Sequence, residues 1–146
     1  MKFTINRSTW RAGGESQASC GIGATSLLNL DGFMCCLGQI MSQLGVPLDI
    51  LLSCGTPHIA LGSDTRYARY SQASALLCIE DPLLDPRGHW SDHTSLAKAA
   101  MAINDDESKS SMAERGAALI ALFTEHGHEI EFTGEYFRQT LAVKGE

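Results

Sequence analysis

The sequence has no long hydrophobic run. No stretch approaches the ~18 apolar residues that a membrane-spanning helix needs, and residues 1–7 lack the apolar core of a signal peptide. Pairs of the form Cys-x-x-Cys are also missing, and the five cysteines are an odd number, so neither a disulfide framework nor a structural zinc site is expected. These absences predict a cytoplasmic chain without membrane contact, metal or other cofactor.

Positive charge is scarce as well. The chain has 11 Lys and Arg against 17 Asp and Glu, a formal net charge of −6, so it has no general attraction for phosphate backbones and is not expected to bind nucleic acid. Aromatic residues make up only 7% of the chain, but 44% of its 146 residues are hydrophobic, which is enough for a buried core. We therefore expect one folded domain over residues 1–146.

The spacing of apolar residues defines the elements of the first third of the chain. Residues Phe3 to Asn6 alternate as a strand does, while apolar residues from Met34 to Leu44 recur with helical spacing and stop before Gly45, a typical C-cap. The intervening residues are rich in Gly, Ser and Ala, as loops are. The predicted elements are a strand over 2–7, a mobile loop over 8–24, a strand over 26–30, a turn at Asp31-Gly32, and helices over 34–44 and 47–53.

The middle of the chain gives weaker patterns. Residues 55–74 have no clear period, and the apolar residues 75–79 fit either a buried strand or a turn of helix. Pro82 and Pro86 bracket a further loop that runs up to Trp90. The sequence therefore leaves the structure of residues 55–80 open.

Two helices are expected in the last third of the chain. The first is capped by Ser91 or Asp92, and the second opens with the capping box Ser111-x-x-Glu114 and ends before Gly127. Each has an apolar face at helical spacing. These faces consist of Leu96, Ala99, Ala100 and Ile103 in the first helix, and of Met112, Gly116, Leu119, Ile120 and Phe123 in the second.

The chain ends with an alternating segment. Residues 128–133 alternate polar and apolar side chains, which predicts a strand with one face in solvent. Residues 134–146 either add an edge strand around Tyr136 and Phe137 or fray and are mobile. Together the elements predict an α+β fold, in which three or four helices pack on a small, mostly antiparallel sheet that includes the first and the C-terminal strands.

Cys35 and Cys36 are the candidate nucleophiles. They lie near the start of a predicted helix, where backbone N–H groups and the helix dipole lower the pKa of a thiol. A nucleophilic thiol also needs a base, and none of the five histidines stands in a pattern that identifies it as the partner. The competing interpretation is that the cysteines are small buried residues, with Cys36 partly buried beside a core residue, Leu37.

The remaining polar clusters do not form a metal site in the sequence. His89 and His93 are four residues apart, but the predicted cap leaves His89 outside the helix, and His126 and His128 straddle a cap. The acidic run 104–107 lacks the register of a calcium loop and is interpreted as a connector between helices.

Cations and aromatic rings lie side by side at two places. Trp10-Arg11 is one, and the segment from Arg66 to Tyr70 is the other. Trp, Tyr and Arg are enriched where proteins bind one another, although packing of Arg stems on aromatic rings is an equally good explanation. The candidate partner-binding residues are Trp10, Arg11, Arg66, Tyr67 and Tyr70.

Two stretches of sequence carry a resemblance to a known group of proteins. The first runs from Asn6-Arg7-Ser8 through Trp10-Arg11 to Met34-Cys35-Cys36-Leu37-Gly38, and the second runs from Ala102-Ile103-Asn104-Asp105-Asp106 to Glu131-Phe132. In these stretches the chain resembles small bacteriophage- and prophage-encoded proteins without an established activity. The resemblance covers both ends of the chain, and it implies a phage origin and a cytoplasmic location in an infected bacterium.

Two functions from different classes fit these observations. The first is a non-enzymatic phage accessory protein that binds a host or defence-system protein, or a second copy of itself. The second is a small thiol- or acid/base-dependent hydrolase acting through Cys35 or Cys36. A closed core with an exposed apolar patch favours the first function, and a deep pocket with a histidine beside either thiol favours the second.

Overall fold

The structure is a computed structural model, and it describes residues 1–12, 27–29, 32–52, 54–62, 64–80, 90–105 and 111–135. Two strands from opposite ends of the chain, β1 (Lys2–Asn6) and β4 (Glu129–Thr133), lie side by side and pair in parallel, with Lys2 opposite Glu129 and Asn6 opposite Thr133. The other elements are α1 (Cys36–Gln43), α2 (Leu48–Leu51), α3 (Pro57–Ala60), α4 (Asp64–Arg69), α5 (Ser71–Leu77), β2 (Cys78–Glu80), β3 (Trp90–His93), α6 (Ser95–Asp105) and α7 (Met112–Glu125).

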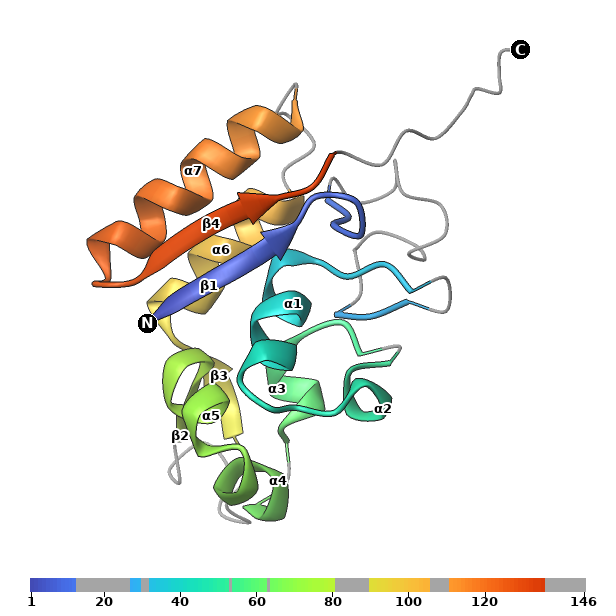
Figure 1. Ribbon diagram of the computed structural model, residues 1–146. Helices are drawn as coiled ribbons and strands as arrows, with labels where there is room; N and C mark the ends of the chain where they lie inside the picture. The colour runs from blue at the N-terminus through green and yellow to red at the C-terminus, as the bar shows by residue number, and fades with distance from the viewer. Residues whose placement is uncertain are drawn as a thin grey trace.

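Alternation in β1 and β4 creates one buried and one solvent-facing side of their sheet. Phe3, Ile5 and Ile130 are buried. The remaining residues of the two strands are exposed or half-buried. Helix α7 packs against β4, and α1 packs against both β1 and α6. The core therefore lies between this sheet and the helices α1, α6 and α7, and it continues to buried residues of α2, α3 and α5 (Figure 1).

The predicted α+β class is confirmed in its coarse form, but the predicted sheet and helix number are wrong. Within the described ranges there are seven helices rather than three or four, and the sheet that joins the first and last strands is parallel. Antiparallel pairing is found only in the described hairpin of β2 and β3. The sequence distance between β1 and β4 explains the error, because only a short connection requires antiparallel pairing.

The predicted elements of the first third are mostly present with shifted ends. Helix α1 begins at Cys36 rather than residue 34, and a Schellman motif ends it, with Gly45 at φ 94° and Val46 N–H donating to the Met41 carbonyl at 3.1 Å. Short helix α2 follows Pro47, as expected. In the described part of the predicted strand 26–30, Leu28 makes one isolated bridge to Leu52.

The segment that the sequence left open contains three helices and a strand. Residues 57–77 form α3, α4 and α5, and α5 runs into β2 at Cys78, so the apolar run 75–79 is both a helix end and a strand start. The predicted helix cap at Ser91 or Asp92 is wrong, because both residues belong to β3. Thr94 caps α6 instead, with its hydroxyl accepting from Ala97 N–H at 3.2 Å.

The predicted capping box at Ser111 is confirmed. The Ser111 hydroxyl accepts from the backbone N–H of Glu114 at 3.0 Å, and α7 begins at Met112. At the other end Gly127 has φ 80°, and His128 N–H donates to the Phe123 carbonyl at 2.8 Å. Backbone groups at both ends of α7 are therefore hydrogen-bonded at the capping residues that the sequence predicted.

Loss of the Ser111 cap is expected to destabilise the protein. Ser111→Ala removes the acceptor of the Glu114 N–H, and its expected cost is about 0.5–2 kcal/mol of unfolding free energy, measured by denaturant titration. Ser111→Asp is the matched control, because an aspartate also accepts at this position and should restore the stability. Equal stability of the Ser111→Ala variant and the parent would contradict a capping role.

Several predicted features lie outside the described residues. These are Cys20 and most of the predicted mobile loop 8–24, Asp31 of the predicted turn, Pro82, Pro86 and His89, and the segment 136–146 with Tyr136 and Phe137.

Candidate functional site

A buried asparagine joins three parts of the chain that are far apart in sequence. Asn104 lies near the end of α6 and is 1% exposed. Its Oδ1 accepts from Trp10 Nε1–H at 2.8 Å and from Cys36 N–H at 3.1 Å. Its Nδ2 donates to the Arg11 carbonyl at 3.2 Å and to Asp105 Oδ1 at 3.0 Å. Both ends of the amide are thus satisfied, and Asn104 fixes the segment after β1 to the start of α1.

The burial of Asn104 was not predicted from the sequence. The acidic run 104–107 was interpreted as a connector after the helix, whereas Asn104 continues the i, i+4 series of buried positions Leu96 and Ala100. A polar residue at an apolar position of this series is the signal that could have identified it.

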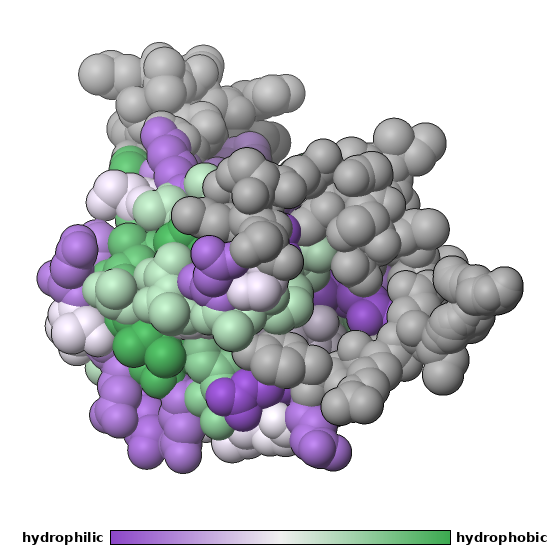
Figure 2. Space-filling view, turned by 90° about the horizontal axis from the view of Figure 1, so that it is seen from above, coloured by the Kyte–Doolittle hydropathy of each residue, from purple (hydrophilic) through white to green (hydrophobic). Residues whose placement is uncertain are grey.

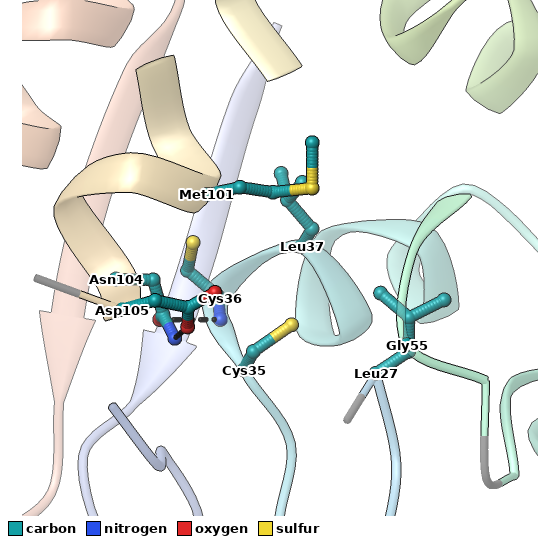
Figure 3. Close-up of a pocket in the computed structure, with 8 residues that line it drawn as sticks. All are labelled: Leu27, Cys35, Cys36, Leu37, Gly55, Met101, Asn104 and Asp105. Atoms are coloured by element: carbon teal, nitrogen blue, oxygen red, sulfur yellow. Dashed lines mark hydrogen bonds between the residues drawn. The ribbon is translucent and has the colours of Figure 1, made fainter. Parts of the chain in front are cut away.

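A small pocket, the Cys35–Asp105 pocket, lies beside this asparagine (Figure 3). The space open to the centre of a water molecule is about 10 Å³, which is room for about one water. The pocket brings together both candidate thiols with Asn104 and Asp105, and no described histidine lines it. Its lining consists of Leu27, Cys35, Cys36, Leu37, Gly55, Met101, Asn104 and Asp105.

The two candidate thiols differ in their surroundings. In Figure 3 their sulfur atoms point in different directions, with Cys36 Sγ turned toward α6 and 3.9 Å from the Ala100 carbonyl oxygen. Cys36 is 1% exposed, more buried than expected, and its burial, with Cys35 and Asp105 nearby, raises the pKa of the Cys36 thiol well above its ordinary range. Cys36 is therefore held as a neutral thiol, because burial disfavours the thiolate.

Cys35 lies immediately before α1 and is also buried. It is the N-cap residue of this helix, but its side chain makes no capping hydrogen bond. Its sulfur points toward the side of the pocket that Leu27 and Gly55 line (Figure 3). Both cysteines line the pocket, but their sulfur atoms are turned toward different sides of it.

The described histidines lie elsewhere in the molecule. His93 Nε2 accepts from His58 N–H at 3.0 Å, which joins β3 to α3, and His126 Nδ1 lies 2.9 Å from the Leu122 carbonyl oxygen. His128 Nδ1 lies 3.1 Å from the N-terminal amino group of Met1. Within the ranges described, no group of three or more His, Cys, Asp or Glu side chains is placed to hold a metal ion.

The burial of His128, beside the N-terminal amino group, makes stability depend on pH. Burial, the positive N-terminus and His126 lower the pKa of His128 below its ordinary value of 6.5. The unfolded chain therefore takes up this proton at higher pH than the folded chain, so stability falls as the pH drops from 6.5 through the lowered pKa. We expect His128→Gln to lose less unfolding free energy than the parent when the pH is lowered from about 7.5 to about 5.

The comparison uses the change with pH rather than the absolute stability. His128 also packs against Phe3 and Phe123, so the variant should be less stable at every pH. A variant with the same pH dependence as the parent, measured by denaturant titration at the two pH values, would contradict the role of His128.

The candidate partner-binding residues do not form one surface. Trp10 is 1% exposed, and the Arg11 guanidinium lies 3.7 Å from the centre of the Phe33 ring, so both are core residues rather than surface contacts. Arg66, Tyr67 and Tyr70 lie on or just after α4, at the opposite end of the molecule from the end of β1 that leads to Trp10 (Figure 1). Arg66 is exposed and the two tyrosines are half-buried.

An exposed apolar stripe on α7 was not identified from the sequence. Ile120, which the sequence analysis assigned to the buried side, is 42% exposed, and Ala113, Ala117 and Ala121 are exposed beside it. These four residues form the α7 outer face. Figure 2, seen from above, shows hydrophobic surface where α7 lies, with hydrophilic side chains around it. The signal in the sequence was the repeat of Ala at intervals of four, which places all three alanines on one helix face.

Comparisons with known proteins do not add a family to this description. The chain matches no protein-family model, and neither a curated protein nor a solved structure matches it. None of the described helices is long and apolar enough to span a bilayer.

Proposed function

We propose that this protein acts by binding another protein rather than by catalysing a reaction. The observation that carries the proposal is the α7 outer face. A surface helix normally presents polar residues to solvent, but four of the seven exposed residues from 112 to 125 are apolar. Small side chains such as Ala113, Ala117 and Ala121 let a partner approach the helix closely, and Ile120 supplies a larger apolar contact.

The partner that fits the other features is a host or defence-system protein in an infected bacterium. The resemblance to small phage proteins supports this setting, and the net charge of −6 disfavours nucleic acid as the target. Self-association through the same face is an alternative form of the same function. Neither form requires a cofactor.

A second candidate function is thiol-dependent hydrolysis at the Cys35–Asp105 pocket. The specific observation in its favour is that Cys35 immediately precedes α1 and lines the same pocket as Asp105. The small volume of the pocket and the raised pKa of the Cys36 thiol weigh against it.

One set of variants separates the two functions. Ala117→Lys and Ile120→Lys place a charge on the α7 outer face, and Ala102→Lys is the matched control, because Ala102 is an exposed alanine on α6. Cys35→Ser and Cys36→Ser remove the thiols. Each variant is checked for folding by circular dichroism and then assayed for bound host proteins, oligomeric state and the phenotype that the gene confers.

Binding through α7 predicts a specific pattern among these variants. Partner binding and phenotype are lost in Ala117→Lys and Ile120→Lys and are retained in Ala102→Lys and both serine variants. Loss of phenotype in folded Cys35→Ser or Cys36→Ser, with labelling of the same thiol by an electrophile, overturns the proposal in favour of the hydrolase.

A further inference from the structure

The two outer edges of the β1–β4 sheet differ in their hydrogen-bond partners. Two glutamines of α1, Gln39 and Gln43, bond to the backbone of β1 as a neighbouring strand would. Thr4 N–H donates to Gln43 Oε1 at 2.8 Å, and Gln43 Nε2 donates to the Thr4 carbonyl at 2.6 Å. Asn6 N–H donates to Gln39 Oε1 at 2.7 Å, and Gln39 Nε2 donates to the Asn6 carbonyl at 3.1 Å. The edge of β1 is thereby closed to other strands.

The edge of β4 has no such cover in the described chain. Glu129 N–H donates to the Met1 carbonyl at 2.8 Å, and Arg7 N–H donates to the Thr133 carbonyl at 2.8 Å. In a parallel ladder alternate residues of a strand bond to the same neighbour, so Ile130 and Phe132 direct their backbone groups away from β1. No other described residue bonds to these backbone groups. An edge of this kind is a template for a further strand.

We propose that the β4 edge binds an extended segment of a partner protein by strand addition, and that this segment alternates basic and apolar residues. The inference rests on the proposed function as a binding protein and adds a second contact that is distinct from the α7 outer face. Backbone hydrogen bonds to Ile130 and Phe132 supply the affinity, and the two sides of the strand select the residue types.

The side chains beside the edge define these residue types. On the solvent side of β4 the side chains of Glu129 and Glu131 are exposed, with Glu131 Oε1 3.0 Å from Lys2 Nζ, and the exposed Glu135 follows just after the strand. Residues of an added strand that lie on this side are therefore favoured if they are Lys or Arg.

On the opposite side of the edge lies the Phe132 ring, with the Arg7 guanidinium 5.4 Å from its centre. There the Phe132 ring lies against α7, so close to Gly116 that a Cβ at that position would lie 3.4 Å from the ring. Its ring centre is also 5.2 Å from that of Trp10. The alternate residues of an added strand face this side and are favoured if they are apolar.

The same charges disfavour a second copy of β4 as the occupant. A two-fold antiparallel pair centred on Ile130 would place Glu129 opposite Glu131 of the second copy. A centre at Glu131 places two Glu131 residues opposite each other. Like charges directly opposite each other destabilise a strand pair, so the sequence of β4 selects a basic partner over itself.

The probes for the experiment are synthetic peptides of alternating valine and lysine, with alternating valine and glutamate as the charge control. Amide hydrogen exchange of the full chain is followed by NMR. In the free protein the Ile130 and Phe132 amides should exchange faster than those of Glu131, Thr4 and Asn6, which have partners. The lysine peptide should slow the exchange of Ile130 and Phe132, and the glutamate peptide should bind about tenfold more weakly.

Two variants of the system separate strand addition from simple charge attraction. N-methylation of the alternate residues on the edge of the lysine peptide that faces β4 should abolish binding, because it removes the donors to β4. The double variant Glu129→Lys/Glu131→Lys, folded as judged by circular dichroism, should reverse the preference and bind the glutamate peptide more tightly. Thr65→Lys, on exposed α4, is the control that should not change the preference.

The outcomes are distinct from those of the α7 variants. Slow exchange of Ile130 and Phe132 in the free protein, lysine-peptide binding that survives N-methylation on either edge, or an unchanged preference in the double variant would each overturn strand addition. Dimerisation through β4 would overturn the choice of partner. None of these results affects the test of the α7 outer face, which uses Ala117 and Ile120.

Discussion

Leu37→Ala is expected to lower the unfolding free energy by about 2–5 kcal/mol. Leu37 is fully buried in α1, at the centre of the core between the β1–β4 sheet and the helices. Truncation removes apolar contacts and leaves a cavity, and the surrounding helices can close it only in part. Denaturant titration of the full chain measures the change.

An exposed leucine on the next helix along the chain, α2, provides the control for Leu37. Leu48 on α2 is 52% exposed, so Leu48→Ala removes the same atoms from a site that is half in water. Its expected cost is below about 1 kcal/mol, because surface substitutions have small effects. If Leu37→Ala cost less than about 0.5 kcal/mol, α1 would not belong to the core.

Gly38→Ala is expected to be the most disruptive addition of a single methyl group. A Cβ at Gly38 would lie 1.8 Å from the backbone oxygen of Leu27, which is far inside contact distance. Either the Leu27 segment or α1 must therefore move, and overpacking of this kind costs about 1–3 kcal/mol, or more where backbone has to shift. The expected result is a lower denaturant midpoint, with altered packing at the Cys35–Asp105 pocket, which Leu27 also lines.

Gly55→Ala is the matched control for this substitution. Gly55 lines the same pocket, but a Cβ there would meet nothing within 4 Å. Its stability should stay within about 0.5 kcal/mol of the parent. If both glycine variants were equally stable, close approach of α1 to Leu27 would not be a constraint on the fold.

Local signals in the sequence were sufficient for individual elements. The capping box at Ser111 and the glycine after His126 identified both ends of α7, and alternation identified β1 and β4. These signals depend on neighbouring residues only, so they survive without knowledge of the tertiary structure. The three short helices between residues 57 and 77 were not found, because each contains too few turns to show a period.

Pairing and burial required the three-dimensional structure. The direction of β1 relative to β4 depends on how the whole intervening chain is arranged, and alternation is the same in parallel and antiparallel strands. Trp10 has the residue type of a binding contact, but a single partner, Asn104, allows it to be buried. The candidate site was therefore only partly predictable: Cys35 and Cys36 do share a pocket, while Asn104 and the α7 outer face were missed.

The closure of the β1 edge by α1 has a consequence for folding during synthesis. Strand β1 can pair with β4 only after residue 133 has left the ribosome. Its bonds to Gln39 and Gln43 close loops of fewer than 40 residues and need only the first 43. Shorter loops cost less entropy to close, so α1 is the first element that can bind β1. It can cover the edge of β1 before β4 has been synthesised.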